Sequence, residues 1–440
     1  MSPSRNPALA MAALDDQVLA IPEGAAPPWW GRAIACTASV TALGFALMAW
    51  TVYRGIGVWG NTSPVFWAFD IINFVFWVGI GHAGTLISAI LLLFRQGWRD
   101  AIARFAEAMT IFAVICAGIF PLLHVGRPWL AFWLFPYPNQ RDLWPNFRSP
   151  LVWDVFAVGT YFTVSLLFWY VGLVPDLASL RERARPGWRR GLYTLLSLGW
   201  RGSATQWAAF GKAYVLLAGL ATALVISVHS VVSFDFAVSI VPGWHMTLFP
   251  PYFVVGAIFA GFAMVILVLS VAREALGLQA ILTWDHLDAM AKVVLGMSCL
   301  MGYAYLMEGF TAWYAQDAHL ARAFGNAVTG QYGWTGILTL ACNVAVPQLL
   351  WRRAWRRSYR VLLPVALAVT VGMWFERFVI IVVNLHQDYL PSSSRPYVPT
   401  WVDLGILAGS FGLFFTLVLL FVRFLPIVAT SELKARGDHA

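Results

Sequence analysis

The sequence is short of charged residues, and this shortage excludes a soluble globular protein. Only 11% of its 440 residues are Asp, Glu, Lys or Arg, whereas soluble domains carry about a quarter. Hydrophobic residues make up 60% of the chain, and its mean hydropathy is +0.70. These values indicate a membrane protein with several spans. The formal charge of +8 does not indicate a nucleic-acid partner, because the basic residues cluster in a few loops, as membrane topology requires.

Cysteine is also scarce, and the common cofactor and catalytic motifs are missing. Cys36, Cys116, Cys299 and Cys342 lie apart within apolar runs, with no CxxC, CxxCH or ferredoxin spacing. We therefore expect buried core cysteines, and neither covalent haem, an iron–sulfur cluster nor another metal in this chain. There is no P-loop, GxSxG or HExxH motif, and the glycines of GIGHAG (79–84) suit close helix packing. The N-terminus lacks the basic and apolar regions of a signal peptide.

Ten apolar runs are long enough to cross a bilayer, which takes about twenty residues each. The predicted fold class is therefore all-α, with a tail over 1–30, a transmembrane domain over 31–425 and a second tail over 426–440. The predicted spans cover 31–53, 68–94, 106–126, 151–173, 207–232, 250–271, 288–314, 331–351, 361–386 and 401–425.

The loops predict the orientation of these spans. The side that includes both termini carries about twenty Lys and Arg, in loops such as RQGWRDAIAR (95–104), LRERARPGWRR (180–190) and WRRAWRRSYR (351–360), against about six on the other side. Both termini are therefore expected in the cytoplasm. The outer loops are rich in proline and tryptophan, and aromatic rings suit the membrane interface. We expect interface anchors at Trp129, Trp133, Trp144, Trp244 and Trp401.

A faint internal repeat predicts two similar halves. Residues 106–129 align with 291–313, which places Glu107 near Lys292 and His124 near Glu308. The helix before each of these segments also ends in an arginine. We therefore expect two four-helix bundles in parallel orientation, over about 68–232 and 250–386, with flanking helices.

One set of ionisable residues gathers at the predicted outer helix ends. His124 closes the third span, Asp154 opens the fourth, and Asp235 follows the fifth. Histidine and aspartate together suit a quinol headgroup, because each hydroxyl needs an acceptor and oxidation removes two protons. A plain N-cap remains an alternative for Asp154, since Asp70 and Asp403 also lie near helix starts. Further residues expected around this site are Arg127, His245 and His229.

A second set lies deeper in the spans, where charged groups are costly. These residues suit a proton path through the bundle: His82, Glu107, Lys292, Glu308, Glu376 and Arg377. Simple charge pairing is the alternative, with Arg377 beside Glu376 and Lys292 against Glu107. Haem b held by two histidines is a further use of membrane histidines. His82 has no obvious partner at its depth, whereas His124 and His229 could be matched.

Several stretches together resemble a known family. They are FDIINFVFWVGIGHAGTLISAILLLFRQ, RFAEAMTIFAV, HVGRPW, LWPNFRSPLVWD and SVHSVVSFDFAVSIVPGWHMTLFPPYFVVGAIFAG. With these stretches the chain resembles the NrfD/polysulfide reductase membrane family over about 55–425, and is most similar to the NrfD-like quinol-binding subunits of bacterial alternative complex III.

The resemblance implies a fold, a site and partners. The fold is two four-helix bundles with flanking helices in the bacterial inner membrane, and quinol is the bound substrate. By motif position the headgroup residues are His124, Asp154 and Asp235, near the periplasmic face. The implied partners are a periplasmic iron–sulfur subunit, c-type cytochrome subunits that pass electrons to cytochrome c or a terminal oxidase, and a second NrfD-like membrane subunit. The inner charged residues resemble the proton route proposed for the family.

Two other classes of function stay open at this point. Ten helices, a repeat and buried charges also suit a transporter or channel, which would have broken helices around a central site. A purely structural membrane anchor would not need His124 or Asp235. The sequence does not distinguish ubiquinol from menaquinol, nor pumping of protons from their release.

Overall fold

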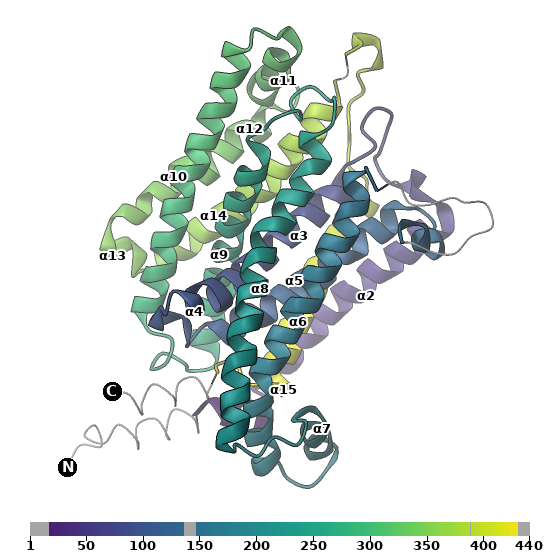
Figure 1. Ribbon diagram of the computed structural model, residues 1–440. Coiled ribbons are helices and arrows are strands. Elements are labelled where there is room, and N and C mark those ends of the chain that lie inside the picture. The colour runs from purple at the N-terminus through teal and green to yellow at the C-terminus, as the bar shows by residue number, and fades with distance from the viewer. Residues whose placement is uncertain (1–16, 136–146, 388, 430–440) are drawn as a thin grey trace.

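The computed structural model describes residues 17–135, 147–387 and 389–429, and in these ranges it contains helices and no strand. Ten helical segments are long and apolar enough to cross a membrane, so the predicted all-α, multi-pass architecture is confirmed (Figure 1). The ten are α2 (Trp30–Arg54), α3 with η3 and α4 (Phe69–Leu93), α5 (Ala103–His124), α6 (Pro150–Arg183), α8 (Ala204–Ala237), α9 (Phe249–Ala275), α10 (Trp284–Tyr314), α12 with η6 and η7 (Gly333–Trp351), α14 with η8 (Tyr359–Val383) and α15 (Trp401–Phe424).

Short helices join the spans, and π-helical turns interrupt three of them. The π-helical turns are η3 (Leu86–Ile90), η6 (Ala341–Ala345) and η8 (Val379–Val383). The short connecting helices are η2 (Ile56–Val58), η4 (Gly97–Arg99), η5 (Pro128–Leu134), α7 (Trp188–Leu196), α11 (Ala318–Thr329), α13 (Arg353–Arg356) and η9 (Pro391–Ser393), with α4 (Leu91–Leu93) and η7 (Val346–Trp351) ending two of the spans.

Two helices are longer than their apolar runs. Both α6 and α8 have 34 residues, whereas the sequence predicted spans over 151–173 and 207–232. Hydropathy finds only the part of a helix that lies in hydrocarbon, and a helix continues wherever water can solvate its polar side chains. One consequence is that Asp235 lies within the last turn of α8 and not beyond its end, which corrects the sequence-based placement.

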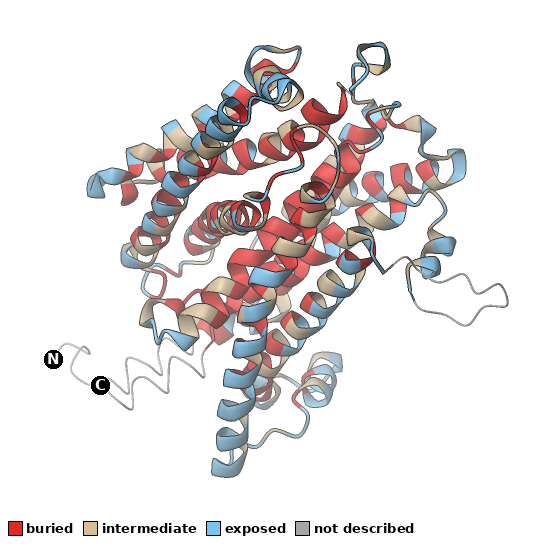
Figure 2. Ribbon diagram, turned by 45° about the horizontal axis from the view of Figure 1, so that its top comes forward, coloured by how far each residue is buried: buried red, intermediate tan, exposed pale blue. Residues whose placement is uncertain are grey.

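The helix α3 lies at the centre of the molecule. All 17 of its residues are buried, and it packs between α5 and α9. Figure 2 shows that buried residues gather in the helices at the middle of the bundle. Small residues allow this close packing, as predicted for GIGHAG: a Cβ atom added to Gly84 would lie 2.0 Å from the carbonyl oxygen of Ala106 in α5. Around this centre, α3, α5, α6 and α8 contact one another, and α9 contacts α8, α10 and α14.

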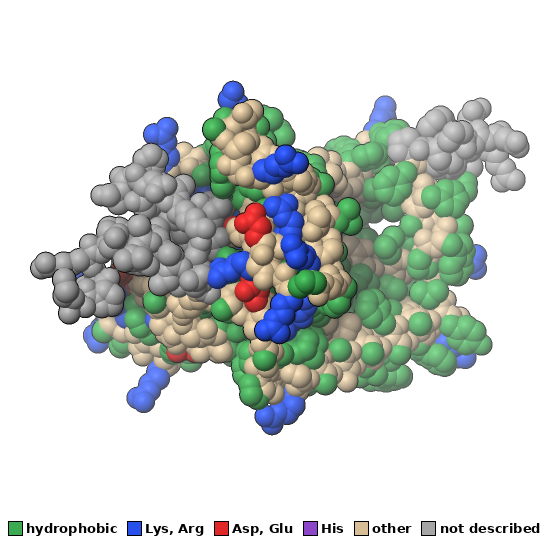
Figure 3. Space-filling model, turned by 90° about the horizontal axis from the view of Figure 1, so that it is seen from below, with side chains coloured by type: hydrophobic (Ala, Val, Ile, Leu, Met, Phe, Trp, Pro, Cys, Tyr) green, Lys and Arg blue, Asp and Glu red, His purple; other side chains and the backbone are tan. Residues whose placement is uncertain are grey.

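One end of the molecule is basic. The connections α4–α5, α6–α8 and α12–α14 meet there, and the view from below in Figure 3 shows Lys and Arg side chains on this face. The described ends of the chain lie at the same end, because Arg423 donates to the carbonyl of Pro22 at 3.1 Å and Tyr193 in α7 donates to that of Phe424 at 2.9 Å. Since α6 ends and α8 begins next to α7, Asp154 and Asp235 lie at the opposite end of the bundle.

The expectation of four buried cysteines is half right. All four are free, and Cys116 and Cys342 are buried, but Cys36 and Cys299 are exposed on helix faces. Lipid surrounds a membrane helix with an apolar medium, so an exposed position there tolerates the same small apolar side chain as the core.

The pair α2 and α15 forms a separate packing unit at the edge of the bundle. The two backbones touch at Gly44 and Gly409, where a Cβ atom on Gly409 would lie 2.4 Å from the Cα atom of Gly44. Without water in hydrocarbon, such close backbone packing replaces the hydrophobic effect as the force between helices.

We predict that Gly409→Ala lowers the stability of the protein by about 1–3 kcal/mol, because the added methyl group must push two backbones apart. Gly219→Ala is the matched control, since a Cβ atom on Gly219 in α8 meets nothing within 4 Å. The measurement is the unfolding free energy in detergent, with the thermal midpoint as a second readout. Equal stability of the two variants would contradict the backbone contact.

Candidate functional site

At the end opposite the basic face, the structure brings two of the three predicted headgroup residues together. Asp154 in α6 and Asp235 in α8 place their carboxyl groups side by side. The helices themselves pack along their length, and Trp153 meets Phe234 edge to face at 6.3 Å. One oxygen of each carboxyl group, Oδ1, is buried without a hydrogen-bond partner among the described residues. Two adjacent carboxyls with unused acceptor atoms form a proton-accepting site that still lacks a partner.

The N-cap alternative for Asp154 is wrong. The residue before the first turn of α6 is Ser149, and Asp154 lies one turn further in, buried to 6% exposure. Its carboxyl group therefore faces Asp235 and does not cap the helix.

The third predicted residue, His124, has a partner that sequence reasoning assigned only to helix capping. Its Nδ1 atom is hydrogen-bonded to Oδ2 of Asp70, in the first turn of α3. Asp70 is buried, and its other oxygen accepts the N–H of Ala68 at 3.2 Å. A carboxylate in this position sets the tautomer of the ring and stabilises a proton on it, as in other histidine–aspartate pairs.

Aromatic rings connect the two pairs. Trp67 lies 6.5 Å from the ring of His124 and 5.8 Å from that of Phe236, the residue after Asp235. Trp244 packs against Trp67 at 5.6 Å, and its Nε1 donates to the carbonyl of Ile380 at 2.5 Å. Trp244 is 2% exposed, so it supports the site from inside and is not the interface anchor predicted from its loop.

The other predicted anchors are exposed or lie outside the described residues. Trp129, Trp133 and Trp401 are exposed, while Trp144 falls outside the described residues. Arg127 and His245, expected around the headgroup site, are exposed as well. His245 contacts the carbonyl of Ser239 at 3.2 Å, so its ring lies against its own loop.

His229 is buried in the bundle and contacts His82. Its Nδ1 lies 3.0 Å from Nε2 of His82, and both rings are fully buried. The expectation that His82 has no partner at its depth is wrong, because α8 crosses α3 and η3 at this point. A haem iron needs two histidines facing it from opposite sides. His82 and His229 are in direct contact, and His124 is paired with Asp70, so these three residues do not fit that group.

The ring of His82 has acceptors at both nitrogen atoms. Nδ1 lies 2.8 Å from the carbonyl of Val78, and Nε2 lies 2.8 Å from that of Val225. A carbonyl oxygen only accepts, so a proton on either nitrogen has a ready hydrogen bond. Tyr161 stacks on the ring at 5.1 Å and donates to Gly81 at 3.0 Å. This geometry lets the ring hold a proton on either side within the membrane.

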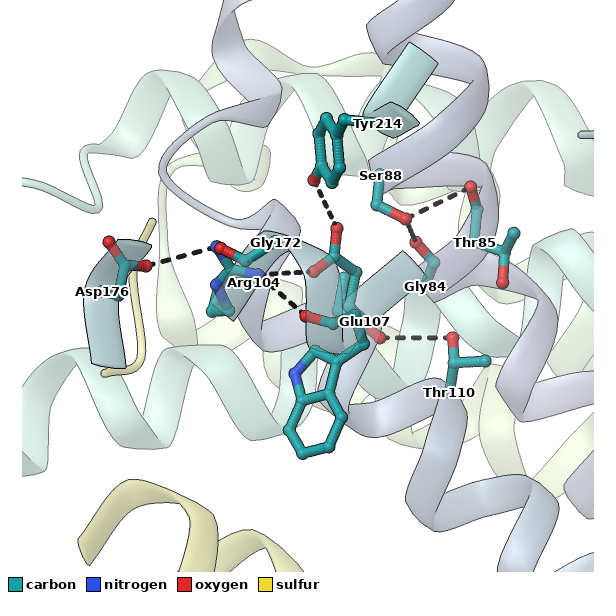
Figure 4. Close-up of polar contacts among 11 residues, drawn as sticks. Gly84, Thr85, Ser88, Arg104, Glu107, Thr110, Gly172, Asp176 and Tyr214 are labelled. Carbon is teal, nitrogen blue, oxygen red and sulfur yellow. Dashed lines mark hydrogen bonds and ion pairs between the residues drawn. The ribbon is translucent and has the colours of Figure 1, made fainter. Parts of the chain in front are cut away.

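Glu107 belongs to a buried polar cluster nearer the basic end. Arg104 donates to Glu107 at 3.1 Å and to Asp176 at 3.2 Å, and Tyr214 donates to Glu107 at 2.9 Å (Figure 4). The proposed pairing of Lys292 with Glu107 is wrong. Lys292 is 60% exposed and pairs with Asp288 at 2.7 Å, because α10 turns this position away from the bundle interior.

The remaining inner residues form a cluster in the second half. Glu376 accepts from Arg377 at 2.5 Å, as charge pairing predicted, and from the hydroxyl of Tyr305. Asn343 in η6 donates to Glu376 at 3.2 Å. Arg377 also lies 4.7 Å from the ring centre of Phe253, and it is within electrostatic range of His229. The inner residues therefore lie in two clusters, one in each half, that approach each other at His229 and Arg377.

Two titratable residues in the loops beside the site are held neutral by burial. Burial raises the pKa of Tyr397 above its ordinary value, and the negative charges of Asp403 and Asp70 act in the same direction. Burial lowers the pKa of His386, whose Nδ1 lies 2.7 Å from the carbonyl of Val383.

Some of these residues were missed by sequence reasoning, although a signal existed for several. Asp70 was treated as a helix start, yet it stands in the same stretch as His82. Arg104 and Asp176 were assigned to loops, because both lie at the edges of apolar runs. Tyr161 and Tyr305 carry no charge, so the search for ionisable groups passed over them.

The comparisons with known proteins identify the family. The family described as "Polysulphide reductase, NrfD" matches residues 57–386, which is 330 of the 440 residues. The chain belongs to the NrfD family. This match contains all of the residues of the candidate site and both inner clusters.

Two curated relatives are similar over most of their length. One, from Halobacterium salinarum, is named as a "Putative dimethyl sulfoxide reductase membrane subunit", and it is 24% identical over 412 residues, covering 88% of this chain and 88% of the relative. The "Hdr-like menaquinol oxidoreductase integral membrane subunit" of Archaeoglobus fulgidus is 22% identical over 323 residues, covering 71% of this chain and 68% of the relative. Both relatives are named as membrane subunits of redox enzymes.

We predict that Arg104→Met destabilises the protein by about 3–5 kcal/mol, because it leaves the buried carboxylates of Glu107 and Asp176 without their cation. Lys292→Met is the control, and it is expected to change stability by no more than about 0.5 kcal/mol, since this exposed side chain lies on the surface. Both are measured as unfolding free energies in detergent. A mild effect of Arg104→Met would show that other groups balance the two carboxylates.

Proposed function

We propose that this NrfD-family chain is the quinol-oxidising membrane subunit of a respiratory complex similar to alternative complex III. The observation that carries the proposal is that the pair Asp154–Asp235 and the pair His124–Asp70 both lie at the end of the bundle opposite the basic face. The name of the Archaeoglobus fulgidus relative, which refers to menaquinol, supports the substrate class.

The two pairs match the chemistry of quinol oxidation. A quinol loses two electrons and two protons, one proton from each hydroxyl group. Asp154 and Asp235 offer buried carboxyl oxygens with free acceptor positions, so they bind one hydroxyl and take its proton. His124 takes the other, and Asp70 stabilises the resulting positive charge on the ring. The packed aromatic group around Trp67 provides the flat apolar wall that a quinone ring needs.

The electrons leave towards partners outside this chain. The site lies close to the outer end of the bundle, which favours an acceptor docked on that face. In this proposal the acceptors are an iron–sulfur subunit and c-type cytochrome subunits, and a second NrfD-like subunit lies beside the chain in the membrane. We place the basic end in the cytoplasm of a bacterium, because basic residues concentrate on the cytoplasmic side and both described chain ends are found there.

Proton movement through the first half is the second part of the proposal. Glu107 and Tyr214 lie nearer the basic end, while His82 and His229 lie between them and the headgroup site. Groups with hydrogen-bond partners at both sides suit proton transfer through a membrane. We leave Lys292 out of this route, because it is 60% exposed and pairs with Asp288.

The alternative functions lack a supporting observation of this kind. A transporter would have helices broken by Gly or Pro around a central site, but the three π-helical turns contain neither residue. Pro121, Pro175 and Pro364 lie inside α5, α6 and α14, and each helix continues past its proline. A structural anchor would not need two adjacent carboxyls with unsatisfied oxygens inside the membrane.

We predict that Asp235→Asn and His124→Gln each lower quinol oxidation by about a hundredfold or more, since each removes a proton acceptor. His245→Ala is the control and should keep the wild-type rate, because this exposed histidine faces its own loop. The rate is measured as quinol oxidation by the assembled complex with an artificial electron acceptor. Normal assembly with an unchanged rate in both site variants would favour the structural anchor.

We predict that His82→Leu lowers the number of protons moved across the membrane per electron, while quinol oxidation in uncoupled vesicles continues. A leucine side chain fills much of the space of the imidazole ring but cannot hold a proton. Lys292→Ala is the control and should leave the ratio unchanged, because Lys292 is exposed. The complex is reconstituted in liposomes and external pH is followed during turnover. A wild-type ratio in His82→Leu would exclude a route through His82.

A further inference from the structure

A cavity of about 360 Å³ lies in the second half of the protein, away from the site described above. It is enclosed by α10, α11, α12 and α14, with Tyr252 of α9 at its inner wall. Its volume falls within the range of sites for small molecules. None of the residues proposed for quinol oxidation is among the described residues that line it.

The part of the cavity nearest the bundle interior is polar. Glu376 and Tyr305 line it, and they are already bonded to each other. Glu308 lines it as well, and no hydrogen bond or ion pair is found for its carboxyl group among the residues that the structure describes. A carboxyl group inside the membrane without a partner is costly. The cavity therefore presents a carboxyl that a bound molecule would satisfy.

The side of the cavity away from the bundle interior is apolar and reaches the surface of the bundle. Leu306 of α10 is 66% exposed and Leu340 of α12 is 42% exposed, and both line the cavity. Phe324 and Val328 of α11, also exposed, complete this side. Because α10 and α12 are membrane-spanning helices, their exposed leucines face lipid. A molecule with a polar head and an apolar tail can enter here from the bilayer.

The position of the cavity repeats that of the headgroup site. In the internal repeat, Glu308 lies near the position of His124, towards the outer end of the corresponding helix. The sequence FPPYFVV (249–255) at the start of α9 likewise stands where FDIINFV (69–75) starts α3. Each half thus has a proton-exchanging side chain at the same place, although the second half has no aspartate at the position of Asp70.

We propose that this cavity is a second binding site for an isoprenoid quinone or quinol, reached laterally from lipid. Glu308 hydrogen-bonds one ring oxygen, the neighbouring tyrosines lie along the ring, and the leucine side holds the start of the tail. The ligand class rests on the proposed function. Among the described residues no Lys or Arg lines the cavity and two Glu do, so the anionic phosphate of a phospholipid is a poor fit. Because this cavity has no counterpart of the Asp154–Asp235 pair, we assign it binding and not oxidation.

The test uses the assembled complex in lipid nanodiscs with a photoreactive azido-quinone, followed by mapping of the labelled peptides. We expect label in two places, around α6–α8 and in the segments of α10, α11 and α14 that line the cavity. Ala323→Phe, which fills the cavity from α11, should lower the second label about tenfold or more, since overpacking excludes the ring. Ala321→Phe is the matched control on the exposed face of the same helix and should keep it.

Two further variants separate this inference from the proposed function. Glu308→Gln should lower the second label, and Ala323→Phe should lower it while quinol oxidation continues at the wild-type rate. Asp235→Asn should stop oxidation and leave the second label in place. Label confined to the first half, or label in the second half that survives Ala323→Phe, would overturn the second site. Unchanged oxidation in Asp235→Asn would instead overturn the proposed function alone.

Discussion

The structure depends on one constraint, the absence of water in the hydrocarbon of the bilayer. Every polar group inside the bundle must find its partner in the protein, because an unpaired one costs several kcal/mol in order of magnitude. Arg104 meets this condition with two carboxylates and two carbonyls, and Glu376 meets it with Arg377, Tyr305 and Asn343. These clusters hold helices together that have little hydrophobic reason to associate in lipid.

Because of this constraint, the carboxyl groups inside the bundle that lack a partner are informative. Three carboxyl groups depart from it: Asp154 and Asp235 keep a buried oxygen without a partner among the described residues, and Glu308 faces a cavity. All three lie towards the end opposite the basic face. Because buried carboxylates such as Glu107 and Glu376 are paired, these three are the carboxyl groups to which we assign a ligand, and in our proposals that ligand is a quinol or quinone. The two halves of the chain then differ in chemistry, because only the first half adds the His124–Asp70 pair and the aromatic group around Trp67.

The central helix α3 brings the two halves of the protein into contact. With α3 entirely buried between α5 and α9, His82 on one side of it meets His229, which lies within electrostatic range of Arg377 in the second half. Arg377 is in turn paired with Glu376, which lines the cavity of the second half. Gly84 keeps α3 close to α5 on the other side, because a Cβ atom there would lie 2.0 Å from the carbonyl oxygen of Ala106.

Composition and hydropathy alone determined the class of the protein, its ten spans and the basic end, because the cost of charge in hydrocarbon acts on each segment separately. The motif positions also indicated His124, Asp154 and Asp235. Only the tertiary structure decided which residues meet. It joined Asp154 to Asp235 and His82 to His229, gave His124 its partner Asp70, and turned Lys292 outward. The physical reason is that contact depends on the rotation and length of each helix. Hydropathy cannot determine the length where a helix such as α8 continues beyond its apolar run. It cannot determine the rotation where a helix such as α3 is buried on every side and has no exposed polar face to orient it.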